Sequence, residues 1–421
     1  MTKTDALRTQ ARLLFDAAVA AADPAKAVRH GLTHNPPPAE KPEGRTFLIA
    51  VGKAAPAMLG EALNALPNPY AALAVTHHEN DATLKDAEIL RAGHPVPDEA
   101  GARAAQRVME LLAEATEHDR VIALMSGGGS ALLPAPPAGV SLADKARLNS
   151  LLLSAGLDIV QMNLVRQQVS LLKGGGFARL ATPASVTAYL LSDVIGDDLR
   201  AIASGPTVSP IGTAKEAVET LKDAGIWGAV PNTIRSHLEQ AQNQSRAPVP
   251  EVSNILVGSN RLSIEAMVAE AGRLGLNARI VSDALTGDVA DAARVVLSEL
   301  VPRPEPTVLL FGGETTVRIK GSGRGGRNQE LALRVALQAP DIAAEWVFLS
   351  GGTDGRDGPT DAAGGLVDAG TLPRINAAGQ DTKALLANND SYAALAAGGD
   401  LLMTRATGTN VADVQVLLIA P

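Results

Sequence analysis

The sequence has no cysteine among its 421 residues, and this absence excludes disulfide bonds, thiolate metal sites and a cysteine nucleophile. Aromatic residues are also rare at 2%, too few for the stacking surfaces that bind single-stranded nucleic acids. Basic residues number 37 against 45 acidic ones, and the formal charge of −8 lacks the positive excess that nucleic-acid backbones require. We therefore expect no nucleic-acid partner.

Long apolar runs are missing as well. No stretch of about 18 consecutive apolar residues occurs, and the first residues, Met-Thr-Lys-Thr-Asp, lack the apolar segment of a signal peptide. We therefore expect a cytoplasmic protein with no membrane partner.

The chain does contain enough apolar sequence for a folded core, with 46% hydrophobic and 19% charged residues. Single cores stop growing at roughly 250 to 300 residues, so a chain of this length predicts two domains. A polar, proline-containing segment at Gln240–Glu251 is the predicted boundary, which gives domains at residues 1–240 and 252–421.

Short apolar runs alternate with glycine-rich turns and helical stretches. In the first domain, helical patterns separate the runs at Thr46–Val51, Val121–Met125 and Ser185–Leu191, which predicts a mostly parallel, doubly wound α/β sheet. The second domain is predicted to be a further α/β module, and its apolar runs are Asn254–Val257, Ala278–Val281, Val308–Phe311, Thr316–Ile319, Trp346–Leu349 and Val414–Ile419.

Small and polar residues collect directly after several of these runs. Open α/β sheets bind ligands at the carboxyl ends of their strands, and glycine lets backbone N–H groups approach an anion closely. We expect the following residues to form a polyphosphate site: Gly52, Ser126, Gly127, Gly128, Gly129, Ser130, Gly312, Gly313, Glu314, Gly325 and Asn328. Each loop alone is also consistent with a tight turn that binds nothing, so the prediction depends on their combination.

Two cations stand beside these loops. Lys53 follows a buried strand directly, where its ammonium group would face a ligand or a carboxylate, or else extend along the surface to water. Arg327 belongs to the first turn of a predicted helix and opposes the helix dipole there. A nearby anion explains that position better than helix stability does, although a solvated arginine is the alternative.

Carboxylates form two groups in the loops. Asp193 follows the strand at Ser185–Leu191, and Asp197 and Asp198 lie on the same loop. Carboxylates near phosphates suit Mg²⁺ coordination or proton abstraction from a hydroxyl group, whereas Asp197 and Asp198 are equally typical of helix caps. The second group either holds magnesium or only forms turns, and its members are Glu314, Asp354, Asp357 and Asp361.

Histidine carries little signal. His77, His78 and His94 show no metal-ligand spacing, and we interpret them as ordinary loop residues. No nucleophile elbow accompanies them, so the sequence gives weak support to hydrolase chemistry.

Nine short strings, in order from about residue 45 to 415, resemble the class II glycerate 2-kinase family, some members of which carry the provisional name hydroxypyruvate reductase. The strings are Val51-Gly-Lys-Ala-Ala55, Gly93-His-Pro-Val-Pro-Asp98, Ser126-Gly-Gly-Gly-Ser-Ala131, Ser192-Asp-Val-Ile-Gly-Asp-Asp198, Ser204-Gly-Pro-Thr207, Gly312-Gly-Glu-Thr315, Gly325-Gly-Arg-Asn-Gln-Glu330, Ser350-Gly-Gly-Thr-Asp-Gly355 and Thr407-Gly-Thr-Asn410.

The resemblance implies phosphorylation of D-glycerate at its 2-hydroxyl group by ATP, with Mg²⁺ as cofactor. It also implies a Rossmann-like N-terminal domain and a smaller C-terminal α/β domain, with the active site in the cleft between them. Lys53, Asp193 and Arg327 would be the catalytic residues, and the residues of the expected polyphosphate site would hold the nucleotide. Lys53 would neutralise the transferring phosphate, Asp193 would act on the substrate hydroxyl group or hold Mg²⁺ together with Asp354, and Arg327 would clamp a carboxylate or the γ-phosphate. A homodimer is the candidate assembly.

Two rival functions are weighed against the kinase. A nicotinamide-dependent hydroxypyruvate reductase would need a dinucleotide fingerprint in the first strand-helix turn. That turn instead reads Gly52-Lys-Ala-Ala-Pro56, with lysine where a close backbone approach would require glycine. A non-catalytic sensor of sugar acids would not require Lys53 or Asp193, and both are present.

Overall fold

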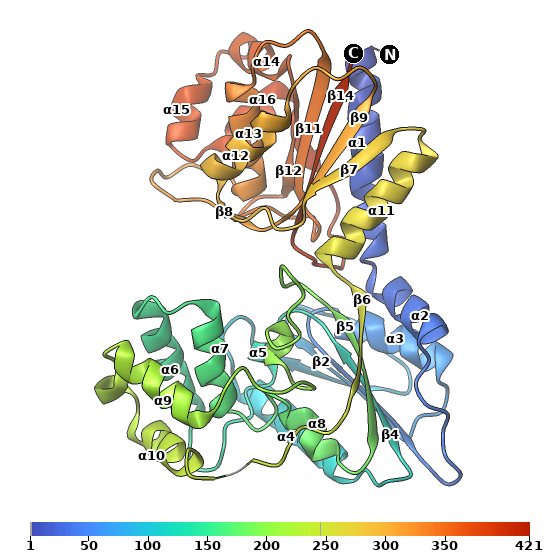
Figure 1. Cartoon of the computed structure of the whole chain (residues 1–421), viewed down its shortest axis with the longest axis vertical. Helices are drawn as coiled ribbons and strands as arrows, with labels where there is room; N and C mark the ends of the chain where they lie inside the picture. The colour runs from blue at the N-terminus through green and yellow to red at the C-terminus, as the bar shows by residue number, and fades with distance from the viewer. Residues whose placement is uncertain (1, 245) are drawn as a thin grey trace. The chain divides into compact units, whose positions relative to one another are not determined.

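The computed structural model of the chain describes residues 2–244 and 246–421. Its contacts divide the chain into two compact units (Figure 1). The N-terminal unit comprises Pro24–Ser192 and Asp197–Val257, and the C-terminal unit comprises the residues up to Asp23, Asp193–Gly196 and Gly258–Pro421. Each unit is built around one six-stranded sheet. No helix in residues 2–244 and 246–421 combines the length and the apolar composition that a membrane crossing requires.

The sheet of the N-terminal unit has the strand order β3-β2-β1-β4-β5-β6. Its strands are β1 (Thr46–Val51), β2 (Ala71–His77), β3 (Glu88–Ala92), β4 (Arg120–Met125), β5 (Ser185–Leu191) and β6 (Ser253–Gly258). The pairs from β3 to β5 are all parallel. This order is that of Rossmann sheets, which confirms the prediction of a doubly wound N-terminal domain.

Helices cover this sheet and form a separate cluster beside it. The helices are α2 (Pro24–His34), α3 (Ala55–Ala65), α4 (Glu99–Ala113), α5 (Gly129–Leu132), α6 (Leu142–Ser154), α7 (Ile159–Gln168), α8 (Gly176–Ala181), α9 (Ala214–Asp223) and α10 (Asn232–Ala241), with short 3₁₀ turns at Ile202–Ser204 and Trp227–Ala229. The pair α2 and α3 contacts β1, β2 and β5, whereas α4 and α8 contact each other and β2, β3 and β5. Every residue of β1 is buried, as expected for a strand covered on both faces.

The separate cluster contains α6, α7, α9 and α10, whose apolar side chains form a core of their own. Helices α6 and α7 are separate, because Asp158 begins a new helix. Its side chain accepts a hydrogen bond from the backbone N–H of Gln161, and the Gln161 side chain accepts one from the backbone N–H of Asp158.

The C-terminal unit has a mixed sheet with the order β13-β12-β11-β14-β9-β7 and a two-stranded ribbon, β10-β8. Its elements are α1 (Lys3–Ala21), α11 (Asn260–Arg273), β7 (Asn277–Ser282), β8 (Gly287–Asp288), α12 (Val289–Glu299), β9 (Thr307–Gly313), β10 (Thr315–Thr316), α13 (Arg327–Gln338), β11 (Glu345–Gly352), β12 (Ala362–Asp368), α14 (Thr371–Ala377), α15 (Thr382–Ala387), α16 (Ser391–Gly398), β13 (Leu401–Met403) and β14 (Asp413–Ala420). The pair β7 and β9 is parallel, and the pairs from β9 to β13 are antiparallel. The predicted strand at Thr316–Ile319 is absent beyond Thr316, and Ile319 is 80% exposed.

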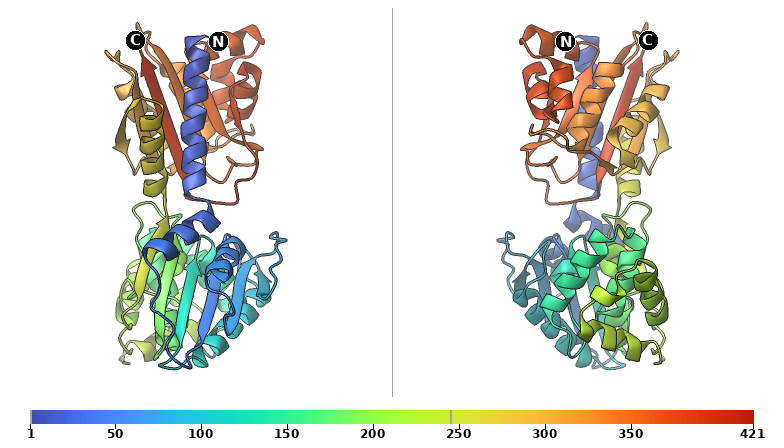
Figure 2. Two further views of the ribbon diagram at one scale, coloured as in Figure 1. Left: turned by 90° about the vertical axis from the view of Figure 1, so that its right-hand side faces the viewer. Right: turned by 90° about the vertical axis from the view of Figure 1, so that its left-hand side faces the viewer.

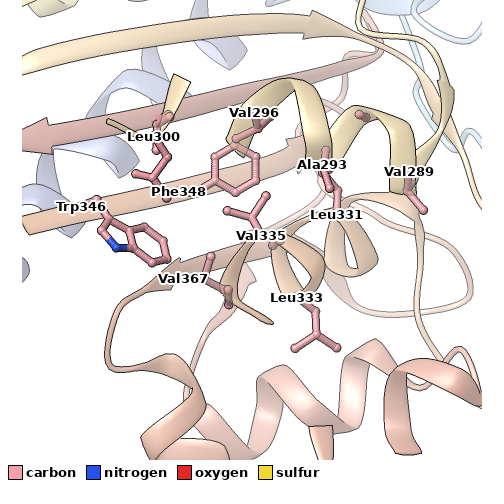
Figure 3. Packing of buried hydrophobic residues seen from close by; sticks show 14 of the residues in the cluster. Val289, Ala293, Val296, Leu300, Leu331, Leu333, Val335, Trp346, Phe348 and Val367 are labelled. Atoms are coloured by element: carbon pink, nitrogen blue, oxygen red, sulfur yellow. The ribbon is translucent and has the colours of Figure 1, made fainter. Parts of the chain in front are cut away.

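Alternation along the strands divides the C-terminal core into two layers. In β9, Val308 and Leu310 pack against α1 and α11, whereas Leu309 and Phe311 pack against α12 and α13. Figure 3 shows the second layer, in which Phe348 of β11 lies among side chains of α12 and α13. A sheet with both faces covered by helices is the expected outcome of such strands.

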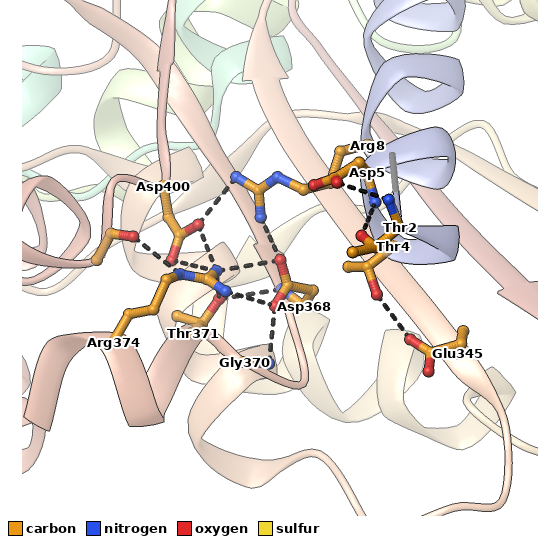
Figure 4. A network of polar contacts seen from close by, with 11 residues as sticks. Thr2, Thr4, Asp5, Arg8, Glu345, Asp368, Gly370, Thr371, Arg374 and Asp400 are labelled. Atoms are coloured by element: carbon orange, nitrogen blue, oxygen red, sulfur yellow. Dashed lines mark hydrogen bonds and ion pairs between the residues drawn. The ribbon is translucent and has the colours of Figure 1, made fainter. Parts of the chain in front are cut away.

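Helix α1 belongs to the C-terminal unit, in contrast to the predicted boundary. It lies along one face of this unit's sheet (Figure 2) and buries Leu14 and Phe15 there. Its Arg8 joins Asp368 and Asp400, which also pair with Arg374 (Figure 4). The boundary prediction failed here because a helical pattern does not show which sheet covers it.

The second boundary also differs. The run Asn254–Val257 was assigned to the second module, but it lies in β6, which joins the sheet of the N-terminal unit beside β5. A polar segment therefore separates α10 from the last strand of the same sheet. The composition of Gln240–Glu251 predicted a loop correctly, but it did not show to which unit the next strand belongs.

Candidate active site

The loops after β1 and β4 meet where the strand order of the N-terminal unit reverses. The backbone N–H of Ser126 donates to Val51 O at 2.9 Å, and that of Lys53 donates to Gly127 O at 2.9 Å. In open α/β sheets, ligands bind outside the carboxyl ends of the strands at such a reversal. The structure thus brings together two loops, Gly52-Lys53 and Ser126–Ser130, that the sequence predicted to share a site.

Gly52 makes the close approach of these loops feasible. Its φ is +130°, and a Cβ atom built on it would lie 2.1 Å from Ser126 Oγ. Ser126 itself is buried, and its Oγ accepts a hydrogen bond of 3.2 Å from the backbone N–H of Ala54. Ser126 therefore stabilises the loop from within, whereas we had predicted that it contacts the nucleotide.

Gly52→Ala is expected to destabilise the N-terminal unit by about 1–3 kcal/mol, since alanine would be strained at this φ and would collide with Ser126. The loop shift should also lower kcat. Chemical unfolding and steady-state kinetics measure the two effects. Gly228→Ala is the matched control, because a Cβ there has open space around it. Equal behaviour of the two variants would contradict the prediction.

Lys53 is exposed after β1, and its charge acts on His77 and His94. A Cβ on Gly128 would lie 3.2 Å from Lys53 Cγ and 3.1 Å from His94 Cδ2, so these three residues adjoin. Burial, together with the charge of Lys53, lowers the pKa of both His77 and His94. His94 was interpreted as an ordinary loop residue, yet it is a neighbour of the predicted catalytic lysine.

The remaining residues of the second loop begin helix α5. Gly129 is buried and Ser130 is partly buried. Ser130 Oγ lies 2.9 Å from Ser204 Oγ and accepts a hydrogen bond of 2.8 Å from Lys173 Nζ. Sequence reasoning missed Lys173, although a lysine directly before Gly174-Gly175-Gly176 was a usable signal.

The acidic residues in the loop after β5 have different surroundings. Asp198 is bound by Arg200, with 2.8 Å between Nη2 and Oδ2, and the hydrogen bonds from Arg200 lower the pKa of Asp198. That pairing fits a structural role. Asp193 and the three residues after it group with the C-terminal unit, which also contains Arg327, whereas we had predicted different domains for Asp193 and Arg327.

In the C-terminal unit, the predicted loop after β9 reaches Glu314. Gly312 and Gly313 close β9 and are buried, and Glu314 is exposed. The Glu314 carboxylate lies 3.1 Å from Nη1 of Arg327. The predicted residues Glu314 and Arg327 are therefore in contact.

Arg327 has a second and closer partner in Asp413. Its Nε and Nη2 donate to the two carboxylate oxygens of Asp413 at 2.6 and 3.0 Å, and Asp413 is 0% exposed. Burial alone would lower the pKa of Arg327, but the hydrogen bonds and charges of Asp413 and Glu314 raise it. The anion expected near Arg327 is thus a side chain of the protein, which the sequence did not reveal.

The first turn of α13 is held by Asp357. Its carboxylate accepts hydrogen bonds from the backbone N–H groups of Asn328 at 3.2 Å and Gln329 at 2.8 Å. Asn328, predicted to bind the nucleotide, is 0% exposed and accepts a hydrogen bond of 2.6 Å from Ser350 Oγ. A Cβ on Gly325 would lie 2.1 Å from Ser391 Oγ, so this glycine also packs inward.

Asp357→Asn is expected to remove a pH dependence of stability. Burial raises the pKa of Asp357 to about 6, so its protonated form stabilises the fold below pH 4 and this contribution is lost as the pH rises through 6. The unfolding free energy of the wild type minus that of the variant should fall by about 2–3 kcal/mol over this window. Urea titrations of both proteins from pH 4 to 7 measure this difference, and a constant difference would contradict the assignment.

A Mg²⁺ ion in the C-terminal unit would need oxygen ligands from a bound phosphate as well as from the protein. Within the described residues no group of three or more histidine or acidic side chains forms a metal cage. Asp354 is partly exposed, and its Oδ1 accepts a hydrogen bond of 3.0 Å from the backbone N–H of Arg356, which leaves further oxygen lone pairs. Mg²⁺ commonly uses one or two carboxylates together with phosphate oxygens and water, and Asp354 suits that pattern.

Two family profiles match the chain. The first, described as a domain of unknown function, DUF4147, covers residues 10–239, and the second, the MOFRL family, covers residues 307–413. The two profiles together span most of the chain.

Named relatives and a solved structure agree with these profiles. The D-glycerate 2-kinase of Thermotoga maritima is 40% identical over 89% of this chain and 91% of its own. A protein of Agrobacterium vitis, provisionally named hydroxypyruvate reductase, is 39% identical over 97% of this chain and 93% of its own. A crystal structure of glycerate kinase from Thermotoga maritima superposes with a TM-score of 0.91 at 38% identity, covering 99% of this chain and 100% of that one. The chain therefore belongs to the glycerate kinase family.

Proposed function

We propose that the protein transfers the γ-phosphoryl group of ATP to the 2-hydroxyl group of D-glycerate, yielding 2-phosphoglycerate and ADP. The reaction requires positioning and charge neutralisation more than covalent chemistry by the protein. The full-length likeness to a D-glycerate 2-kinase supports the substrate and the reaction.

The structural observation that carries the proposal is the position of Lys53 beside Gly128, after the central strand β1. An exposed ammonium group stands at the strand-order reversal of a Rossmann sheet, against a glycine loop. A phosphate bound there would meet a cation and backbone N–H groups, which stabilise the charge that develops during transfer.

We assign the remaining roles in the same terms. Asp193 orients or deprotonates the substrate hydroxyl group, and Arg327 offers the edge of its guanidinium that faces Glu314 to a carboxylate or phosphate. Asp193 and Asp354 are the residues that would hold Mg²⁺. When bound, this ion would neutralise phosphate charge.

The reductase is the second candidate function, because one relative bears that name. Hydride transfer from a nicotinamide cofactor requires a close approach of its pyrophosphate to the first strand-helix turn. Here Lys53 follows Gly52 in that turn, and its side chain lies beside Gly128. We therefore favour the kinase.

Two coupled assays decide between these functions. With ATP, Mg²⁺ and D-glycerate, the product should be consumed by enolase, which acts on 2-phosphoglycerate but not on 3-phosphoglycerate. Oxidation of NADH or NADPH by hydroxypyruvate, without ADP formation from glycerate, would replace the kinase by the reductase. Omission of Mg²⁺ tests the cofactor, and light scattering tests the proposed homodimer.

A further inference from the structure

A pocket of about 360 Å³ opens in the N-terminal unit beside Gly128 and Ser130. Three cationic side chains line it, Lys145 of α6, Arg166 of α7 and Lys173 before α8. Apolar walls complete it, with contributions from Val96, Pro97, Leu142 and Leu148. We call it the basic pocket.

The three cations donate hydrogen bonds to neutral oxygen atoms. Lys173 is 6% exposed and donates to Ser130 Oγ, Lys145 Nζ donates to Val169 O at 2.6 Å, and Arg166 donates to Asn149 Oδ1. In residues 2–244 and 246–421, none of the three forms an ion pair with a carboxylate, and the pocket lining contains neither aspartate nor glutamate. Clustered, partly buried cations without anions are costly to the fold, so they favour a function that supplies an anion.

Electrostatics points in the same direction. Burial, and to a lesser degree the charge of Arg166, lowers the pKa of Lys145 to about 7. Burial, then the charges of Lys145 and Arg166, lowers the pKa of Lys173 well below its usual value. A bound polyanion would reverse these effects by restoring the charged forms.

Size and charge select the kind of anion. A volume of about 360 Å³ lies within the roughly 300–1,000 Å³ typical of sites for ligands as large as nucleotides. A single carboxylate such as that of glycerate would leave two of the three cations unmatched, whereas a phosphate chain carries several charges. The apolar walls add contact area that a small acid would not use.

Position connects the basic pocket to Lys53. Gly128 lines the basic pocket, and a Cβ on it would lie 3.2 Å from Lys53 Cγ. His94 lines the pocket as well and adjoins the same glycine. A chain of phosphates held by Lys173 would therefore extend past Gly128 toward Lys53.

We propose that the basic pocket binds the phosphate chain of a nucleoside triphosphate, with Lys145, Arg166 and Lys173 as its anchoring cations and the terminal phosphate beside Lys53. This inference rests on the proposed kinase function and names its nucleotide site. It attributes nucleotide affinity to Lys145, Arg166 and Lys173, which were not predicted as site residues from the sequence.

Binding measurements test the proposal without turnover. Isothermal titration of the whole protein with inorganic tripolyphosphate, and separately with Mg-ATP, should give dissociation constants at least about tenfold higher in Lys173→Met and in Lys145→Met than in the wild type. Methionine preserves most of the side-chain volume, and circular dichroism verifies folding. Lys215→Met, on the exposed surface of α9, removes one charge elsewhere and should change neither constant.

The outcomes separate this proposal from the proposed function. Unchanged affinity for both probes in Lys145→Met, the less buried site, would overturn the basic pocket as the nucleotide site even if the enzyme makes 2-phosphoglycerate. A rise in KM for D-glycerate with unchanged ATP affinity would assign the pocket to the acid substrate and overturn the proposal. Weaker binding of tripolyphosphate in a protein that forms no 2-phosphoglycerate would support the phosphate pocket while the kinase function fails.

A pH measurement adds a readout that a purely structural lysine would not move. Lys145 faces Arg166 and Lys173, and His94 lines the same pocket. At pH 8, above the lowered pKa of Lys145, tripolyphosphate binding should take up more protons in the wild type than in Lys145→Met, because the ionisation of the ligand is the same in both titrations. Titrations in buffers of different ionisation enthalpy measure this uptake, and equal uptake in both proteins would remove Lys145 from the site.

Discussion

Lys53→Ala is expected to lower kcat by a factor on the order of 10² or more, because the ammonium group would stabilise charge mainly in the transition state. The KM for ATP should change far less. Lys53 is exposed, so the unfolding free energy of the N-terminal unit should stay close to that of the wild type. Steady-state kinetics with both substrates and chemical unfolding give these quantities.

Two comparisons sharpen this test. Lys215→Ala removes an exposed lysine from α9 and controls for the loss of one charge. Lys173→Met should show the complementary pattern, with a large change in ATP affinity and a smaller one in kcat. Near-normal turnover of Lys53→Ala, or its failure to fold, would return this residue to a surface or structural role.

The order of elements in the N-terminal unit was largely accessible from the sequence. Buried runs at Thr46–Val51, Val121–Met125 and Ser185–Leu191 became β1, β4 and β5 with nearly the same bounds. Gly52 and Ser126 were placed in one site because carboxyl ends of parallel strands share an edge. The contact between these two loops could not be predicted, because it depends on β1 and β4 being neighbours in the sheet.

Strand β12 was missed for a physical reason. Its sequence, Ala362–Asp368, contains two adjacent glycines, which are typical of turns. In the structure a Cβ on Gly364 would lie 1.9 Å from Ser350 O, and one on Gly365 would lie 2.7 Å from the Ala332 side chain. These glycines permit close packing on both sides of the strand, a requirement that sequence patterns do not express.

Side-chain partners were the least predictable part of the candidate site. Lys145, Leu148 and Leu152 share one face of α6, so a lysine on an apolar face was a visible signal. Asp413 opens an apolar run and was equally visible as a charge at a buried position. Neither residue reveals its partner without the fold, because Arg327 and Asp413 are separated by 86 positions.

Arg327→Ala is expected to lower the unfolding free energy of the C-terminal unit by about 3–5 kcal/mol, because it leaves the carboxylate of Asp413 buried without its cation. Trp346 lies in this unit's core, and Trp227 is the other of the two tryptophans in the chain. In a Trp227→Phe background, urea unfolding followed by the fluorescence of Trp346 therefore reports on the C-terminal unit alone.

A double variant separates structure from catalysis at this site. Replacing both residues by apolar ones, as in Arg327→Leu with Asp413→Leu, should recover most of the lost stability, since it removes the buried charge of Asp413 together with its half-buried partner. Turnover should stay lost, because a leucine cannot bind a carboxylate or phosphate in place of the guanidinium. If the double variant regains near-normal kcat along with its stability, Arg327 serves only to neutralise Asp413, and the clamp on the substrate must come from another residue.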